Sequence, residues 1–213
     1  GSQYINTDFL STANTEFVMD FQLTDSTGDR KIIGQSQTFG LATLNNRWRI
    51  SDSLWYLSTV TTDTNRHTAS TDAGKYYLGT TLLADRADKK GVGTYPMLLF
   101  CTSKTGSVLP DGNKAKMKLY SCIITDGGVT IRDYIPVRKG TVGYLYDKVS
   151  GQLFGNSGTG SFTYGNDVPT TYDSEVEYLQ STGTQWIDTG IIPQEGDELE
   201  IKLKQTTAKD HAP

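Results

Sequence analysis

Carboxylate pairs are the first residues to consider, because two acidic side chains cleave glycosidic bonds in retaining hydrolases. Residues 1–174 include one glutamate, Glu16, and the next carboxylate along the chain is Asp20. On one strand these two residues would share a face about 13 Å apart, whereas the retaining reaction needs about 5–5.5 Å. This pair is therefore not expected to cleave sugars.

Nucleophilic and metal chemistry is limited by the small number of histidines, which are His67 and His211. Two histidines argue against a histidine-based zinc site and leave His67 as the one base available in the body of the chain for a catalytic triad. Ser70 and Asp72 follow it, but R-H-T-A-S-T-D is typical of a strand edge and a turn, and no G-x-S-x-G elbow occurs. We predict no catalytic residues and a protein that is not an enzyme.

The two cysteines, Cys101 and Cys122, each lie in an apolar run, M-L-L-F-C and L-Y-S-C-I-I. This setting predicts two free, buried thiols. A single bridge between neighbouring strands is the alternative.

Exposed aromatic rings can stack on sugar faces, and two stretches supply candidates. They are Trp48, Trp55 and Tyr56 in R-W-R-I-S-D-S-L-W-Y-L, and Tyr76 and Tyr77 in G-K-Y-Y-L-G. Adjacent residues on a strand point to opposite faces, so one residue of each neighbouring pair should face away from the core. For each of the five, packing in the core is the alternative to ligand binding.

A cofactor is not predicted. Calcium is the one metal considered, because it prefers several oxygen ligands, and no loop shows the D-x-D-x-D-G spacing. The aspartates that could contribute are Asp72, Asp85, Asp88, Asp111 and Asp147. No ligand set is assigned among them.

The composition favours β structure, with 22 Gly and 12 Tyr in the whole chain and a single Glu in residues 1–174. Turn signals separate short runs with strand spacing, and C-I-I-T-D-G-G-V-T-I predicts a hairpin. Only Leu82–Lys90 has a helix-like composition, enough for one short turn. Strands are expected at 3–7, 15–24, 31–34, 38–43, 47–51, 54–60, 75–79, 96–102, 115–125, 129–135, 142–146, 152–154, 161–163, 176–180, 185–188 and 198–204.

Charge and hydropathy exclude several partners. The net charge is -4 and no block of Lys and Arg occurs, which argues against nucleic acid. No run of about 18 apolar residues is present, so we expect no membrane insertion.

A block near the end of the chain repeats one at its beginning. Gly183–Thr189 (G-T-Q-W-I-D-T) aligns with Gly1–Thr7 (G-S-Q-Y-I-N-T), and the alignment continues downstream without a gap. Apolar positions then alternate at 17, 19 and 21 and at 199, 201 and 203, which is strand spacing. We interpret this as a structural unit of about 182 residues in a tandem array. Convergent strand chemistry is the alternative.

Two longer blocks resemble a known family. Residues 132–162 (R-D-Y-I-P-V-R-K-G-T-V-G-Y-L-Y-D-K-V-S-G-Q-L-F-G-N-S-G-T-G-S-F) resemble the C-terminal signature of laminin-G-like, concanavalin A-like jelly-roll domains of gut-bacterial and phage surface proteins. Residues 177–190 (E-Y-L-Q-S-T-G-T-Q-W-I-D-T-G) resemble their N-terminal signature, and 95–101 and 115–124 stand where the family places two central strands.

The resemblance implies an all-β fold, a two-sheet antiparallel jelly-roll sandwich. Residues 1–174 would form this domain without its first strand. Residues 175–213, which carry 3 Lys and 8 acidic residues, would form the first strands of the next repeat. That tail would pack in cis or be exchanged between chains, with self-association as a result.

The resemblance also implies an extracellular, cell-surface or virion location. The expected function is non-catalytic binding of a carbohydrate or a cell-surface glycoconjugate. A structural spacer or assembly domain of a fibre or adhesin is the alternative. Glycoside hydrolase is a minor alternative, since the laminarinase-type hydrolases share the fold but use an E-x-D-x-x-E strand that this sequence lacks.

Overall fold

The computed structural model describes residues 2–87, 91–104, 106–107, 109–110, 112–168, 188, 190, 192, 194–196 and 198. The chain divides into two compact units, Gly1–Asn166 and Asp167–Pro213. The packing predicted for residues 175–213, in cis or by exchange, lies outside the described residues.

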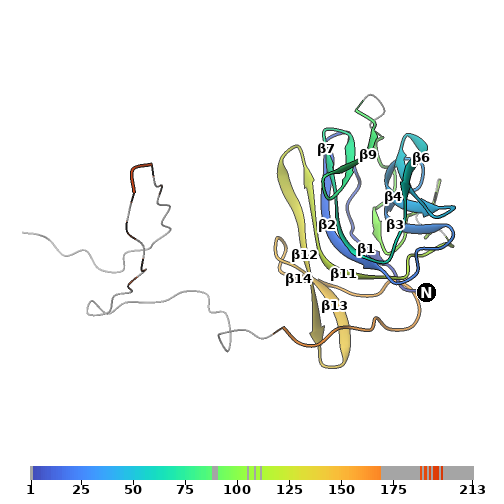
Figure 1. Cartoon of the computed structure of the whole chain (residues 1–213). Helices are drawn as coiled ribbons and strands as arrows, with labels where there is room; N and C mark the ends of the chain where they lie inside the picture. The colour runs from blue at the N-terminus through green and yellow to red at the C-terminus, as the bar shows by residue number, and fades with distance from the viewer. Residues whose placement is uncertain are drawn as a thin grey trace, which may run out of the picture. The chain divides into compact units, whose positions relative to one another are not determined.

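The first unit is built from two antiparallel sheets that face each other (Figure 1). The six-stranded sheet has the order β1 (Ile5–Asn6), β10 (Leu98–Leu99), β3 (Arg30–Gln35), β4 (Phe39–Leu44), β5 (Arg47–Asp52) and β6 (Leu54–Thr61). The eight-stranded sheet has the order β14 (Gln152–Phe154), β13 (Val142–Asp147), β12 (Val129–Lys139), β11 (Met117–Asp126), β2 (Thr15–Leu23), β7 (Arg66–Asp72), β8 (Lys75–Leu78) and β9 (Thr81–Asp85). The predicted all-β, two-sheet antiparallel sandwich is confirmed.

The core lies between the sheets and follows from strand alternation. In β2, Phe17, Met19 and Phe21 are buried while the residues between them are partly or fully exposed. Phe21 meets Trp48 of the opposite sheet edge to face at 5.9 Å between ring centroids, and Phe17 meets Phe39 at 5.8 Å. These edge-to-face contacts join the two layers.

The predicted hairpin is confirmed. Strands β11 and β12 pair antiparallel and close with Asp126 opposite Val129. Gly127 and Gly128 form the turn with φ of 57° and 82°, a conformation that glycine adopts without steric cost. Cys101 and Cys122 are both buried and free, as the first interpretation predicted.

Three local predictions were wrong. Leu82–Lys90 begins within strand β9 rather than a helical turn, and its last three residues lie outside the description. Residues 161–163 form no strand, because Phe162 packs against Phe100 from irregular backbone at 4.8 Å between ring centroids. Residues 66–72 are not a strand edge but strand β7, which pairs with both β2 and β8.

Within the described ranges, no segment forms a helix with the length and apolar character that crossing a bilayer requires.

Candidate functional site

Two of the five aromatic candidates belong to the core. Trp48 is 0% exposed and contacts Phe21 and His67 edge to face. Tyr76 is 1% exposed and its hydroxyl donates to the carbonyl of Ser51 at 3.2 Å. Neither ring can stack on a sugar, so Trp48 and Tyr76 are removed from the candidate set.

The other three candidates lie on separate surfaces. Trp55 is held on the outer face of the six-stranded sheet by two cations, with Arg49 3.9 Å and Lys31 4.4 Å from its ring centroid. Tyr56 is 39% exposed on edge strand β6, and Tyr77 is half-buried on β8 of the other sheet. The structure therefore does not gather these residues into one binding surface.

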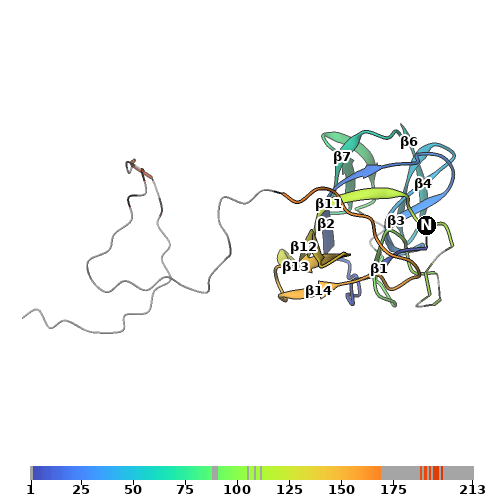
Figure 2. The same cartoon turned by 90° about the horizontal axis from the view of Figure 1, so that it is seen from below.

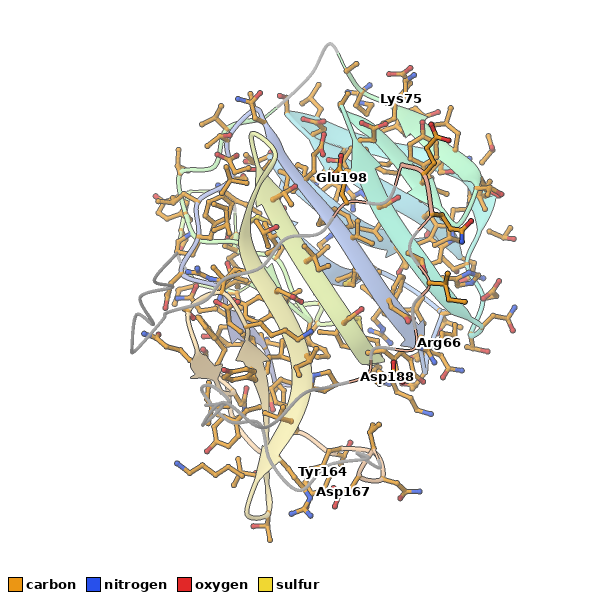
Figure 3. All side chains as sticks on the ribbon, turned by 90° about the vertical axis from the view of Figure 1, so that its left-hand side faces the viewer. Arg66, Lys75, Tyr164, Asp167, Asp188 and Glu198 are labelled. Atoms are coloured by element: carbon orange, nitrogen blue, oxygen red, sulfur yellow. The ribbon has the colours of Figure 1, made fainter. Side chains whose placement is uncertain are left out.

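The residues considered for catalysis are engaged elsewhere. His67 Nε2 lies 2.7 Å from Asp63 Oδ1, not beside Ser70 or Asp72. Asp20 accepts two hydrogen bonds from Arg66, at 2.8 and 2.6 Å, on the outer face of the eight-stranded sheet that Figure 3 views. These hydrogen bonds lower the pKa of Asp20, against the effect of burial, so the group is held as a carboxylate.

Glu16 lies on the same face, as the spacing predicted, and its Oε1 accepts a hydrogen bond from the backbone of Ala73 at 2.8 Å. Glu16 and Asp20 thus each hold a protein group and do not face each other as a catalytic pair.

The described aspartates among those considered for calcium, Asp72, Asp85 and Asp147, do not converge. Among the described residues, no three acidic, histidine or cysteine side chains form a group that could hold a metal ion. Asp88 and Asp111 lie outside the description. Asp72 and Asp85 are exposed on neighbouring hairpins, and Lys75 Nζ lies 4.0 Å from Asp85.

Asp147, which was considered for calcium, organises a turn. It is fully buried, and its Oδ1 accepts from the backbone amides of Asp133 at 2.9 Å and Val149 at 3.2 Å. Its Oδ2 accepts from the Ser150 hydroxyl at 2.7 Å. Burial raises the pKa of Asp147, but these hydrogen bonds and the charge of Arg132 outweigh it and lower the pKa overall.

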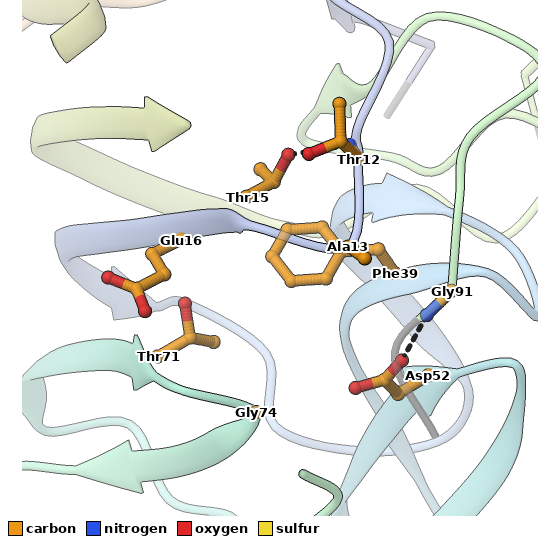
Figure 4. A pocket seen from close by; sticks show the side chains of 9 residues that line it. All are labelled: Thr12, Ala13, Thr15, Glu16, Phe39, Asp52, Thr71, Gly74 and Gly91. Atoms are coloured by element: carbon orange, nitrogen blue, oxygen red, sulfur yellow. Dashed lines mark hydrogen bonds between the residues drawn. The ribbon is translucent and has the colours of Figure 1, made fainter. Parts of the chain in front are cut away.

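A hollow beside Asp52 is too small for a ligand (Figure 4). Its volume is about 10 Å³, and the residues around it include Glu16, Phe39 and Thr71. The backbone amide of Gly91 donates to Asp52 Oδ1 at 2.6 Å across it. Such a space accommodates about one water molecule.

A larger pocket lies at the edge strand β1 and has a volume of about 270 Å³. We call it the β1 pocket. Tyr4, which directly precedes β1, and Asn6 of β1 line it, and Leu98 reaches it from the position paired with Asn6. Its full lining is Tyr4, Asn6, Pro96, Leu98, Leu109 and Ser157.

The loop after β14 holds the strand that carries Tyr4. Asn156 Oδ1 accepts from the Tyr4 backbone amide at 3.1 Å, and the Ser157 amide donates to the Tyr4 carbonyl at 2.9 Å. Figure 2 shows this segment, in orange, running from β14 past the N-terminus. Gly158 has to lack a side chain here, because a Cβ would lie 2.0 Å from the Ser2 carbonyl oxygen.

The β1 pocket combines an aromatic ring with polar groups that have spare hydrogen-bonding capacity. Asn6 Oδ1 accepts from the amide of Asp8 at 3.0 Å. Within the described part of the chain, no hydrogen bond engages the Tyr4 hydroxyl, the Asn6 amide nitrogen or the Ser157 hydroxyl. Lys114 Nζ lies 5.8 Å from the centroid of the Tyr4 ring.

Sequence reasoning missed this pocket. The block Q-Y-I-N-T was noticed for its repetition, and its alternation already places Tyr4 and Asn6 on one face. Nothing local predicts that Ser157 and Leu109 meet them there.

Comparison with known proteins shows what the chain is similar to. No protein-family model matches it, and no curated protein matches it. Among solved structures, a protein of Bacteroides ovatus ATCC 8483, to which carbohydrate binding is attributed, matches with a TM-score of 0.51 and 12% identity. The match covers 74% of this chain and 56% of that one, so this chain spans little more than half its length. The likeness supports the sandwich fold, and membership of the laminin-G-like family stays a prediction.

Proposed function

We propose that the first unit is a non-catalytic carbohydrate-binding module and that the β1 pocket is its binding site. The observation that carries this proposal is the lining of the pocket. A sugar offers a weakly polar ring face and a rim of hydroxyls, and the pocket offers a tyrosine ring beside an amide and two hydroxyls. The carbohydrate binding attributed to the structurally similar Bacteroides ovatus protein supports the same class of ligand.

The same lining supports the proposal that the module binds without cleaving. None of the residues that line the β1 pocket is acidic, whereas glycoside cleavage requires an acid and a nucleophile or base. Glu16 and Asp20, the pair considered for catalysis, both lie on β2. Glu16 accepts a hydrogen bond from the amide of Ala73, and Asp20 accepts two from Arg66. An extracellular site of action, on a cell or a virion, is part of this proposal, because glycoconjugates are displayed there.

The test is a glycan array followed by calorimetry on the oligosaccharides that bind. Tyr4→Ala should weaken binding about tenfold, which corresponds to about 1.4 kcal/mol for the lost ring contact. Asn6→Ala should weaken it by a similar factor, because the amide can no longer donate to a sugar hydroxyl.

Tyr77→Ala is the matched control, since it removes a half-buried tyrosine from the opposite sheet. Equal losses in Tyr4→Ala and Tyr77→Ala would reject the β1 pocket as the site. If the wild-type protein binds no glycan class on the array, carbohydrate binding is rejected and the spacer role is favoured.

A further inference from the structure

The N-terminal segment that contains β1, residues 2–8, lies in a slot of defined chemistry. We call this the first-strand slot; it is formed by residues 97–99 and 156–161. The Ser2 hydroxyl donates to the Thr159 carbonyl at 2.7 Å, and Gln3 Nε2 donates to the Ser161 carbonyl at 3.3 Å. Each of these contacts requires a particular side chain on the strand.

The inner part of the slot places stricter requirements on the side chains of the segment, because it buries them. Ile5 is 1% exposed and pairs with Leu99 of β10. Thr7 is fully buried, and both its amide and its hydroxyl donate to the Met97 carbonyl, at 3.1 and 2.8 Å. The slot therefore favours a hydroxyl, an amide, an isoleucine and a threonine at set positions.

The block near the end of the chain meets each requirement. Thr184 keeps the hydroxyl of Ser2, and Gln185, Ile187 and Thr189 are identical to Gln3, Ile5 and Thr7. Trp186 replaces the aromatic Tyr4, and Asp188 replaces Asn6. The side chains that the slot contacts are thus retained or replaced by close equivalents.

The described residues at the end of this block, Asp188 and the following Gly190, repeat the local backbone of Asn6 and Asp8. Asn6 Oδ1 accepts from the amide of Asp8 over 3.0 Å, and Asp188 Oδ1 accepts from the amide of Gly190 over 2.9 Å. Asp8 and Gly190 both have left-handed backbones, with φ of 53° and 65°. The two hydrogen bonds therefore join equivalent positions in the alignment of the two blocks.

The agreement continues downstream. A turn forms at residues 13–14 and again at 195–196, which are equivalent positions in the same alignment. Glycine adopts the left-handed conformation more readily than aspartate, so the second block suits this backbone at least as well as the first.

We propose that residues 184–190 of one copy of this chain bind the first-strand slot of another copy in place of residues 2–8, joining copies head to tail. One sequence then encodes both the slot and the segment that fills it, and the interface between copies is heterologous. A heterologous interface builds open chains of molecules, unless the rotation from one copy to the next closes a ring. The added strand forms the same backbone pairs with β10 as the strand that it replaces.

The first experiment tests whether the slot accepts the second block. The full chain with Ser2→Thr, Tyr4→Trp, Asn6→Asp and Asp8→Gly carries that block in the position of the first. We expect a melting temperature within about 3 °C of the wild-type value. Adding Ile5→Asp is the control, and it should lower the melting temperature by about 10 °C or more. A fourfold variant that melts as low as this control would overturn the proposal.

The second experiment tests exchange between copies. A chain that lacks residues 1–8 should form concentration-dependent oligomers in light scattering, because its tail fills the vacant slot of a neighbour. Adding Ile187→Asp to that chain should abolish the oligomers. A chain lacking residues 1–8 that stays monomeric, stays unfolded, or associates equally well with Ile187→Asp would overturn the proposal.

Discussion

Replacing Asp147 with alanine removes the acceptor on which the β13–β14 turn is built. The carboxylate is fully buried and accepts from Asp133, Val149 and Ser150 within 3.2 Å. Without it, the backbone amides of Asp133 and Val149 and the hydroxyl of Ser150 lose their acceptor at a partly buried turn, at about 1–3 kcal/mol for each group that water does not reach. We expect Asp147→Ala to lower the free energy of unfolding by about 4 kcal/mol and the melting temperature by about 10 °C.

Urea unfolding followed by far-UV circular dichroism measures this loss, with Asp85→Ala as the control. Asp85 is exposed, Lys75 Nζ lies 4.0 Å from its carboxylate, and its hydrogen bond from the Ala87 amide, at 3.2 Å, is open to water, so its removal should change stability by about 0.5 kcal/mol or less. A loss below about 1 kcal/mol for Asp147→Ala would refute the reasoning, because the carboxylate would then be dispensable to the turn.

The pH dependence follows from the lowered pKa of Asp147. A group whose pKa is lower in the folded state stabilises the fold fully above its unfolded pKa, about 3.9. That contribution is lost as the pH falls through the folded pKa. The stability difference between the wild type and Asp147→Asn should therefore be constant above about pH 5 and shrink below about pH 4.

Three further predictions test other parts of the structure. Burial, with a smaller contribution from a nearby carboxylate, raises the pKa of Cys122 to about 12. Because Cys101 and Cys122 are both buried, neither should react with a thiol reagent at about pH 8 in the folded protein, and both should react once it is unfolded. Gly158→Ala should lower the free energy of unfolding in urea by about 2–4 kcal/mol, because its Cβ would overlap a backbone oxygen. Gly112→Ala is the control and should be neutral, since its Cβ would meet nothing within 4 Å. Equal effects of the two substitutions would contradict the tight packing of the loop around Gly158. Lys114→Gln should weaken binding of glycans with a carboxylate or sulfate about fivefold and leave neutral glycans unaffected, a contrast that calorimetry in low salt would measure.

Strands with strong alternation could be predicted from the sequence. T-E-F-V-M-D-F-Q-L places large apolar residues at every second position, and the structure buries Phe17, Met19 and Phe21 accordingly. Strand β7 was missed because the residues that it turns inward, Ala69 and Thr71, are small and give little contrast in hydropathy.

Local composition misled the prediction where pairing between strands decides the conformation. The run L-L-A-D contains good helix formers, yet it pairs with β8 and forms β9. Strand preference depends on the neighbouring strand and on burial, and neither is visible in a short window of sequence.

The candidate site was predictable only in part. Alternation correctly predicted that one of Trp55 and Tyr56, and one of Tyr76 and Tyr77, turns away from the core. It could not predict that the outward rings belong to different sheets. The β1 pocket requires Tyr4 and Ser157 to lie side by side, although they are near opposite ends of the domain in the sequence. Only the folded chain brings them together.

Under the exchange proposed above, the copy that donates the first strand would also supply the residues of the β1 pocket that this segment carries, Tyr4 and Asn6 or their counterparts. A pocket rebuilt with Trp186 and Asp188 gains a wider platform and a negative charge. Its preference would shift toward larger sugar faces and away from acidic ones, with every core residue unchanged. Variation in a short peripheral peptide could thus diversify what neighbouring copies recognise, while the stability of the sandwich is preserved.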